Sequence, residues 1–304
     1  MDGIININKP PGKTSYSVVA LVKRLSGERR VGHAGTLDPL ATGVLPICLG
    51  QGTRIVEFLQ NARKTYRAQI ELGVTTDTYD ASGKIIRKED PSSIGREQLE
   101  SALAAFRGLT QQTPPMYSAV KHQGQRLYEL ARAGINVARK SRPVIIYHLG
   151  IVDWQPPVVT IEVECGKGTY IRSLAHDLGQ SLGCGANLKS LIRLSYGPFD
   201  VKTAVSTSQL EDAFCYGYWQ HFLHAIDAVL LSCKAMVVND ATENAIRSGA
   251  PVTLANYNGI VLTESSTDTL CRTYTLDGHF LGLLRFDQQR GQWQPEKVFL
   301  SPDG

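Results

Sequence analysis

The stretch with the clearest potential for chemistry is GHAGTLDPLATG, from Gly32 to Gly43. It holds one carboxylate, Asp38, and one imidazole, His33, among residues that carry no other charge. A carboxylate can attack an electrophilic carbon or accept a proton, and glycines let a ligand approach the backbone closely. Asp38 also precedes Pro39, which disfavours helical backbone and makes the start of a turn an equally natural role. Taken alone, the stretch leaves a catalytic and a structural role open.

Other polar clusters give weaker signals. Lys9 to Ser15 looks like a phosphate loop but lacks the required glycine and lysine spacing. Asp77 and Asp80 lack the acid spacing of a calcium loop, so a turn is predicted there. A single histidine, His33, does not indicate a metal site. The six cysteines include no C-x-x-C pair, which excludes a zinc ribbon and a redox dithiol.

Regular elements are predicted on both sides of these residues. Ser15 is expected to cap a helix that runs to Leu25 and ends at Gly27. Apolar residues alternate with polar ones from Tyr66 to Leu72, which predicts a half-buried strand with Tyr66 on its apolar face.

Further elements follow along the chain. We expect a helix over about Arg96 to Phe106 and a strand over Val159 to Cys165. The turn Gly166 to Gly168 then leads into a helix that carries Leu174, Leu178 and Leu182. Because strands and helices alternate without a steady βαβ rhythm, the predicted fold class is α+β.

The length of 304 residues suits roughly two domains of about 150 residues. After Asp227 the sequence changes to short strand-like pieces, with hairpin turns expected at Asn258-Gly259 and Asp277-Gly278. We therefore expect one domain over residues 1–230 and a small β domain over 233–304. Lys and Arg number 26 against 20 Asp and Glu in residues 1–232, but 6 against 8 in 233–304. This asymmetry weakly favours a polyanionic partner for the first domain.

Nothing in the sequence indicates a membrane protein. The longest apolar runs are far shorter than the ~20 residues of a membrane helix, and the start Met-Asp-Gly-Ile is not a signal peptide. A cytoplasmic protein is expected.

Six segments in fixed order resemble the TruB family of bacterial tRNA pseudouridine-55 synthases. They are Asn8–Ser15, Gly32–Gly43, Lys64–Arg67, Pro115–Ala119, Lys167–Arg172 and Leu191–Leu194. The resemblance runs from about Gly3 to Gly197, and the ending Trp293–Phe299 resembles the small PUA-like RNA-binding domain of that family. It implies a pseudouridine synthase fold, a mixed and largely antiparallel sheet flanked by helices, followed by a small β-rich domain.

The resemblance also implies a reaction and its residues. Uridine 55 in the T arm of tRNA would be flipped out and isomerised to pseudouridine without a cofactor or a metal, by a protein expected to be a monomer. Asp38 matches the essential carboxylate of the family, and Arg172 the arginine that pairs with it. The other matched substrate-binding positions are His33, Tyr66, Tyr170 and Leu191.

A basic stretch, Gln111 to Pro143, lies where the resemblance implies an insertion that clamps the RNA. It carries Lys121, Arg126, Arg132, Arg139, Lys140 and Arg142 against one acid, Glu129. Lys121, Arg126 and Arg132 are the predicted RNA-binding residues of this stretch. A solvated basic face without a ligand is the alternative interpretation.

The sequence departs from the family pattern at two positions, and two other functions are alternatives to the one that the resemblance implies. Thr36 stands where the family often has a different small residue, and Ile192 stands where the closing motif of the family has a basic one, a difference that bears on one basic contact and not on the chemistry. A noncatalytic tRNA-binding or RNA-folding module is the alternative function, and the intact set Asp38, Tyr66 and Arg172 argues against it. A glycosidase would need a second carboxylate in the matched motifs, which is missing.

Overall fold

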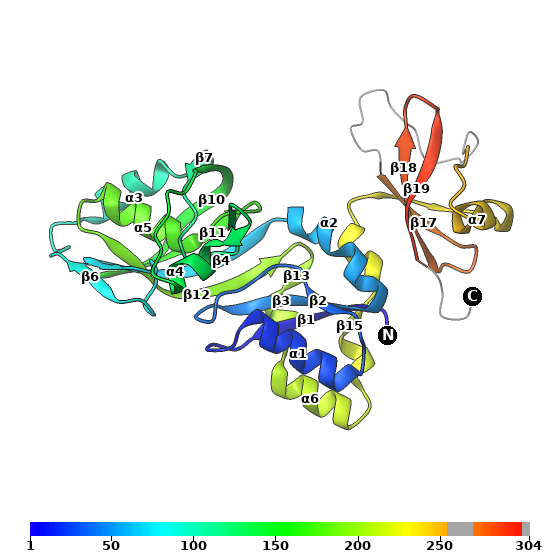
Figure 1. Ribbon diagram of the computed structural model, residues 1–304, viewed down its shortest axis with the longest axis horizontal. Helices are drawn as coiled ribbons and strands as arrows, with labels where there is room; N and C mark the ends of the chain where they lie inside the picture. Colours follow the sequence, from blue (N-terminus) through cyan, green and yellow to red (C-terminus); the bar gives the residue numbers. More distant parts are fainter. Residues whose placement is uncertain (254–269, 300–304) are drawn as a thin grey trace. The chain divides into compact units, whose positions relative to one another are not determined.

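The computed structural model describes residues 1–253 and 270–299, and the chain forms two compact units, Met1–His224 and Ala225–Gly304 (Figure 1). Each unit has its own hydrophobic core. The fold alone does not test the roles expected for the two parts of the chain, catalysis for the first and RNA binding for the second, and both stay predictions.

The first unit is built on one mixed sheet. Eleven strands of the described chain belong to it, and its main path runs β14-β1-β3-β12-β4-β11-β10-β7. Most neighbouring pairs are antiparallel, while β1 with β14 and β3 with β12 are parallel. The strands are β1 Gly3–Lys9, β2 Val31–His33, β3 Thr42–Leu49, β4 Lys64–Leu72, β7 Gly108–Gln112, β10 Arg142–Gln155, β11 Val158–Cys165, β12 Ala186–Tyr196, β13 Phe199–Asp200, β14 Val205–Ser206 and β15 Leu223–His224. Two small hairpins stand apart, β5 Val74–Thr76 with β6 Ile85–Lys88, and β8 Lys121–His122 with β9 Gln125–Arg126.

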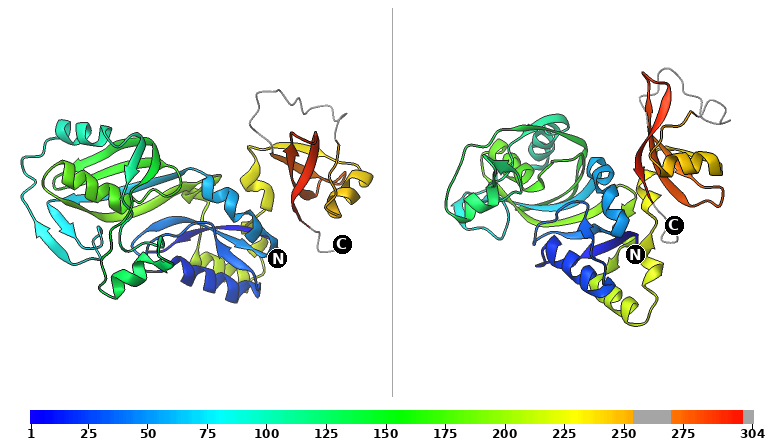
Figure 2. Two further views of the ribbon diagram at one scale, coloured as in Figure 1. Left: turned by 45° about the horizontal axis from the view of Figure 1, so that its top comes forward. Right: turned by 45° about the vertical axis from the view of Figure 1, so that its right-hand side comes forward.

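Helices pack on the sheet in two groups. Helix α3 (Arg96–Ala104) contacts α5 (Ile171–Ser181), and they pack against β10 and β12 respectively. At the other end of the unit, α1 (Ser15–Ser26) and α6 (Thr207–Cys215) lie side by side (Figures 1 and 2). The other described helices of this unit are α2 Val56–Asn61, α4 Leu127–Arg132 and the 3-10 turns Gly50–Ile55, Val201–Thr203 and Trp219–Phe222, while the 3-10 turn Ile226–Leu230 belongs to the second unit.

The predicted elements of the first unit are present, with one correction at a helix start. In β4, the side chains of Tyr66, Ala68, Ile70 and Leu72 are buried, as the alternation predicted. The predicted cap of α1 was wrong, because the Thr14 side chain accepts the hydrogen bond from the Ser17 N–H. Ser15 lies inside the helix and is buried, so it is free to contact the loop that carries Asp38.

The second unit is a four-stranded sheet with one helix. The sheet order in the described residues is β16 (Lys234–Val237), β17 (Leu270–Tyr274), β18 (Phe280–Asp287) and β19 (Gln292–Val298). Asp277-Gly278 forms the predicted hairpin turn between β17 and β18, whereas Asn258-Gly259 lies outside the described residues. Helix α7 (Asp240–Arg247) was not anticipated from the sequence; its Ile246 packs into the core of this unit.

Within the described ranges, every helix is too short or too polar to span a lipid bilayer.

One close backbone approach fixes the end of the Asp38 loop. Strands β3 and β12 pair in parallel over Thr42 with Ile192 and Gly43 with Arg193. Gly43 has φ +96°, and a Cβ atom there would lie 2.2 Å from the Arg193 carbonyl oxygen. Only glycine therefore fits, and the loop enters β3 beside β12 at this point.

Replacing this glycine provides a test of the packing. We expect Gly43→Ala to lower the free energy of unfolding by at least about 2 kcal/mol more than Gly108→Ala does. Gly108 is the matched control because its φ is +82° but the space around it is open. Urea unfolding of both variants measures the difference, and equal losses would show that the strands separate to admit a side chain.

Candidate active site

The loop that carries Asp38 is held on both sides of the carboxylate. The Ser15 hydroxyl accepts a hydrogen bond from the Leu37 N–H at 2.8 Å and donates to the Leu37 carbonyl at 3.0 Å. Beyond Asp38, the Gly12 N–H donates to the Pro39 carbonyl at 2.8 Å. The Ala41 N–H donates to the Asp38 carbonyl at 3.0 Å, so the residue does start a turn. The backbone at Asp38 is thus tied to the N-terminal segment, and the side chain has little freedom of position.

Lys9 also connects the N-terminal segment to the Asp38 loop. It is fully buried, and its ammonium donates to the carbonyls of Lys13 at 2.7 Å, Pro10 at 3.0 Å and Pro39 at 3.4 Å. Burial lowers the pKa of Lys9 to about 8, although the nearby Asp38 charge acts in the opposite direction. The segment that resembled a phosphate loop is therefore a clamp on the Asp38 loop, which its sequence did not reveal.

Arg172 lies directly against Asp38. Its Nε is 2.9 Å from Asp38 Oδ2, and the arginine side chain is 5% exposed whereas that of Asp38 is 36% exposed. The Arg172 guanidinium also donates to the carbonyl of Tyr117 at 2.9 Å and to that of Thr78 at 3.4 Å. A buried cation held by two carbonyls fixes the direction of the carboxylate, and the carboxylate keeps one side open to a ligand.

A second carboxylate, Asp80, faces the same guanidinium. Its Oδ2 lies 3.7 Å from Arg172 Nε and its side chain is 7% exposed. Its Oδ1 accepts hydrogen bonds from the Thr78 hydroxyl at 2.8 Å and from the backbone N–H of Ser82 at 3.0 Å. From the sequence, Asp80 was expected only in a turn. Its approach to Arg172 depends on a bridge between Asp80 and Leu188 of β12, which no local pattern signals.

These charges act on Asp38 in opposite directions. Burial raises the pKa of the Asp38 carboxyl above its usual value, the Arg172 charge opposes the rise, and the Asp80 charge adds to it. Solvent on the open side of Asp38 limits the rise. Arg172 therefore favours the ionised form of this carboxyl, whereas burial and the like charge of Asp80 oppose it.

Three other predicted residues lie on the elements around this pair. Tyr66 on β4 is 8% exposed and stands opposite Arg193 of β12. Burial raises the pKa of the Tyr66 hydroxyl, and the Arg193 charge counteracts this. Leu191 of β12 is also buried. Tyr170 precedes α5, and its backbone exchanges two hydrogen bonds with the Gln112 side chain, at 2.7 and 3.0 Å.

Arg193 lies in the matched segment Leu191–Leu194, and its side chain is fully buried. Its Nε donates to the Val44 carbonyl at 2.6 Å and its Nη2 to the Gly35 carbonyl at 3.1 Å. It therefore braces both ends of the Asp38 loop from β12. The buried Tyr196 adds a third brace, because its hydroxyl donates to the Ala34 carbonyl at 2.8 Å.

His33 stands at the start of the loop, in β2. It is partly buried, and burial lowers the pKa of its imidazole below the usual value. The Nδ1 atom is buried and has no hydrogen-bond partner among the described residues. A neutral imidazole at this position suits stacking or hydrogen bonding, and its contact with RNA stays a prediction.

The predicted RNA-binding residues lie on the β8–β9 hairpin and α4, apart from the Asp38 pair. Lys121, Arg126 and Arg132 are exposed. Arg126 donates to the Tyr128 hydroxyl at 3.0 Å, and the Arg132 guanidinium lies 5.4 Å from the centre of the same ring. Arg172 donates to the Tyr117 carbonyl at the base of this segment, so the segment is anchored next to the candidate site.

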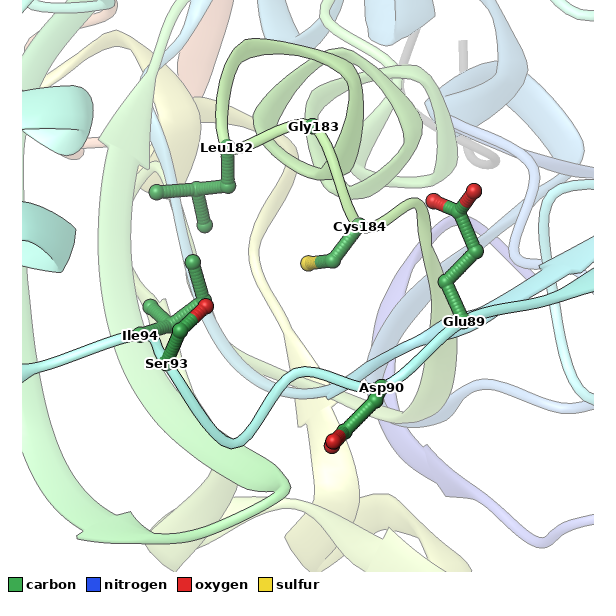
Figure 3. Close-up of a pocket in the computed structure, with 7 residues that line it drawn as sticks. All are labelled: Glu89, Asp90, Ser93, Ile94, Leu182, Gly183 and Cys184. Atoms are coloured by element: carbon green, nitrogen blue, oxygen red, sulfur yellow. The ribbon is translucent and has the colours of Figure 1, made fainter.

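The cavity drawn in Figure 3 lies elsewhere. It has a volume of about 460 Å³ between the end of α5 and residues 89–94. Glu89 and Asp90 line it together with Cys184, and none of the predicted site residues does. Glu89 is paired with Arg87, but the lining of the cavity itself includes two carboxylates and no Lys or Arg, so this cavity is not the expected RNA site.

Comparison with known proteins decides the family. The profile described as "TruB family pseudouridylate synthase (N terminal domain)" matches residues 23–171, and that of the "tRNA pseudouridylate synthase B C-terminal domain" matches residues 172–238. A Dehalococcoides mccartyi protein named tRNA pseudouridine synthase B is 42% identical over 99% of this chain and 98% of its own length. The chain belongs to the TruB family. It is thus an isomerase of the pseudouridine synthase class.

Other relatives agree with this membership. A Clostridium perfringens protein named tRNA pseudouridine synthase B is 39% identical over 95% of this chain and 96% of its own length. Among solved structures, a Cbf5-Nop10-Gar1 complex contains a chain that is 27% identical, with a TM-score of 0.74, covering 99% of this chain and 86% of that one. The predicted α+β pseudouridine synthase fold with a small β-rich domain is confirmed.

The charge arrangement predicts how the pKa of Asp38 responds to substitution. We expect Asp80→Asn to lower the pKa of the Asp38 carboxyl, because it removes a like charge that raises this pKa. Asp77→Asn, in the same loop, is the matched control and leaves the pKa in place. Carboxyl-carbon NMR titration of the free protein measures it, and an unchanged or higher value in Asp80→Asn would contradict the electrostatic account.

Proposed function

We propose that this TruB-family chain converts uridine 55 in the T arm of tRNA to pseudouridine, with Asp38 as the catalytic carboxylate. The observation that carries the proposal is the ion pair of 2.9 Å between Asp38 and Arg172. The names of its relatives, tRNA pseudouridine synthase B, support the choice of tRNA. The action at uridine 55, the monomeric state and the cytoplasmic location stay predictions.

The reaction is an isomerisation and needs no redox partner. The bond from ribose C1′ to N1 of uracil breaks, the base turns, and a bond from C1′ to C5 forms. The proton leaves C5 and N1 gains one, so the atoms balance without a cofactor. An extruded base is required, because the reacting atoms are inaccessible within a folded RNA.

The carboxylate can take part in three ways that the geometry leaves open: attack on the ribose, addition to the base, or removal of the C5 proton. Each use needs an ionised carboxylate with one accessible side and a fixed direction. The positive charge of Arg172 favours the ionised form of Asp38 and fixes the direction of its carboxylate. The exposed third of the Asp38 side chain lets the substrate reach it. The pair therefore supports the reaction whichever route is taken.

The neighbouring residues have separate roles in the proposal. Tyr66 and Leu191 provide buried, mainly apolar surface for the extruded uracil, and Tyr170 borders the same site. Burial keeps the Tyr66 hydroxyl protonated, so it can donate to the base or pass on a proton. His33 contacts the RNA where the base leaves the stack. A noncatalytic RNA-folding module would not require this arrangement around an ionised carboxylate.

Removing the reacting group tests the assignment of Asp38. We expect Asp38→Asn to reduce single-turnover pseudouridine formation by roughly three orders of magnitude or more and to leave the tRNA dissociation constant within about tenfold, because the loop keeps its shape. Asp77→Asn serves as the matched control, with activity close to that of the wild type. Substantial turnover by Asp38→Asn would reassign the chemistry to another group.

The basic segment provides a test of how tRNA is held. We expect replacement of Lys121, Arg126 and Arg132 by Gln to weaken tRNA binding and to flatten the slope of log affinity against log salt by up to about 2 units, at roughly 0.7 to 0.9 per lost phosphate contact. The rate at saturating tRNA should fall less than the affinity.

A control with the same loss of charge separates contact from general electrostatics. Lys84, Lys88 and Lys202 are exposed lysines outside this segment. Their joint replacement by Gln should leave the salt slope nearly unchanged. Equal slopes for the segment variant and the wild type would show that the segment is a solvated face.

A further inference from the structure

A second cavity opens beside the candidate active site. Its volume is about 590 Å³, within the range of roughly 300 to 1,000 Å³ typical of small-molecule sites. Its walls come from the Asp38 loop, the end of α2, the start of β4, the start of β10 and the turn before α5. The lining residues used below are Gly35, Lys64, Arg142, Lys167, Tyr170 and Tyr196. Asp38, Tyr66 and Leu191 do not line it, so it is a neighbour of the proposed base pocket.

The charges of this cavity have one sign. Lys64, Arg142 and Lys167 line it, and its lining includes no Asp or Glu. The cavity of Figure 3 has the opposite character, with Glu89 and Asp90 and no Lys or Arg. Three cations around one open volume without a carboxylate create a field that favours an anion.

No ion pair within the described chain neutralises these cations. Lys64 donates to the carbonyls of Ala62 at 2.9 Å and Gln60 at 3.1 Å, and its ammonium lies 4.4 Å from the centre of the Tyr196 ring. Lys167 donates to the neutral Asn61 side chain at 2.9 Å. For the exposed Arg142 guanidinium, the described residues provide no hydrogen bond or ion pair. Lys64 is thus held in place by neutral groups, while Arg142 is available to a ligand.

The pKa of Lys64 also indicates that the cavity favours an anion. Burial lowers the pKa of Lys64 to about 8, and the positive charges of Arg193 and Lys167 contribute to the lowering. A bound anion would offset this repulsion. The guanidinium of Arg142 also has the planar geometry that suits two oxygens of one phosphate.

The position of the cavity next to the Asp38 loop indicates which anion it would bind. Gly35 belongs to the Asp38 loop, and Tyr170 is adjacent in sequence to the helix that carries Arg172. A uridine whose base reaches Asp38 has its two phosphodiester groups within one nucleotide of that carboxylate. We propose that this cavity is a phosphate subsite, which binds the phosphodiester of a nucleotide adjacent to the target uridine. The inference rests on the proposed function and goes beyond it by assigning Lys64, Arg142 and Lys167 to a particular part of the RNA.

Neutral linkages placed one at a time in the RNA test the subsite. We would measure dissociation constants of T-arm stem-loops that carry a single methylphosphonate at each position around the target uridine. For the wild type, one linkage near the target should weaken binding by roughly tenfold, about 1.4 kcal/mol. In the variant Arg142→Gln/Lys167→Gln that linkage should have no further effect, while linkages elsewhere keep theirs.

The control is Lys84→Gln/Lys88→Gln, which removes the same charge from exposed positions that do not line the cavity. It should retain the complete wild-type profile. An identical profile in the cavity variant and in the wild type would overturn the subsite. If uridine 5′-monophosphate bound to the wild type and not to the cavity variant, while the methylphosphonate profiles stayed identical, the cavity would be a site for a free nucleotide and the proposal would again be wrong.

These binding measurements are independent of catalysis. Failure of the proposed function would appear as wild-type protein that forms no pseudouridine in tRNA. Failure of the subsite alone would appear as normal pseudouridine formation with unchanged methylphosphonate profiles.

Discussion

The ion pair between Asp38 and Arg172 is the interaction on which the rest of the site depends. A buried guanidinium is costly unless its charge is balanced, and here the Asp38 carboxylate balances the charge while the carbonyls of Thr78 and Tyr117 accept hydrogen bonds from the guanidinium. Three segments that are distant in sequence thereby converge on one cation. The arrangement places a cation against a carboxylate in a partly dry site, where a charged reacting group has its largest effect.

The fold contributes rigidity around this pair. Ser15 and Lys9 hold the Asp38 loop from the N-terminal segment, and Arg193 holds it from β12. The close pairing of Gly43 with Arg193 fixes the point at which the loop enters the sheet. Because these contacts come from buried strands and their ends, the core of the unit positions the carboxylate. Less of the binding energy of the RNA is then needed to order the site.

The sequence predicted the parts of the molecule whose signals are local. Alternation in β4 placed Tyr66 on an apolar face, and the TruB motifs indicated Asp38 and Arg172. The partnership of Asp80 with Arg172 was missed, because it requires a bridge between residues 80 and 188 that leaves no periodic trace. The roles of Lys9 and Arg193 were missed for a similar reason, since a buried cation that bonds to carbonyls reads in sequence as a surface charge. The cap of α1 was misplaced by one residue because Thr14 and Ser15 are both good capping residues.

The carboxylate site is expected to act on one uridine of tRNA. The most direct measurement is to incubate the full chain with an unmodified tRNA transcript, without added metal or cofactor, and to map pseudouridine at single-nucleotide resolution. We expect one pseudouridine, at uridine 55 in the T arm. Modification of other uridines with uridine 55 unchanged, or no pseudouridine from protein that binds the transcript, would contradict it.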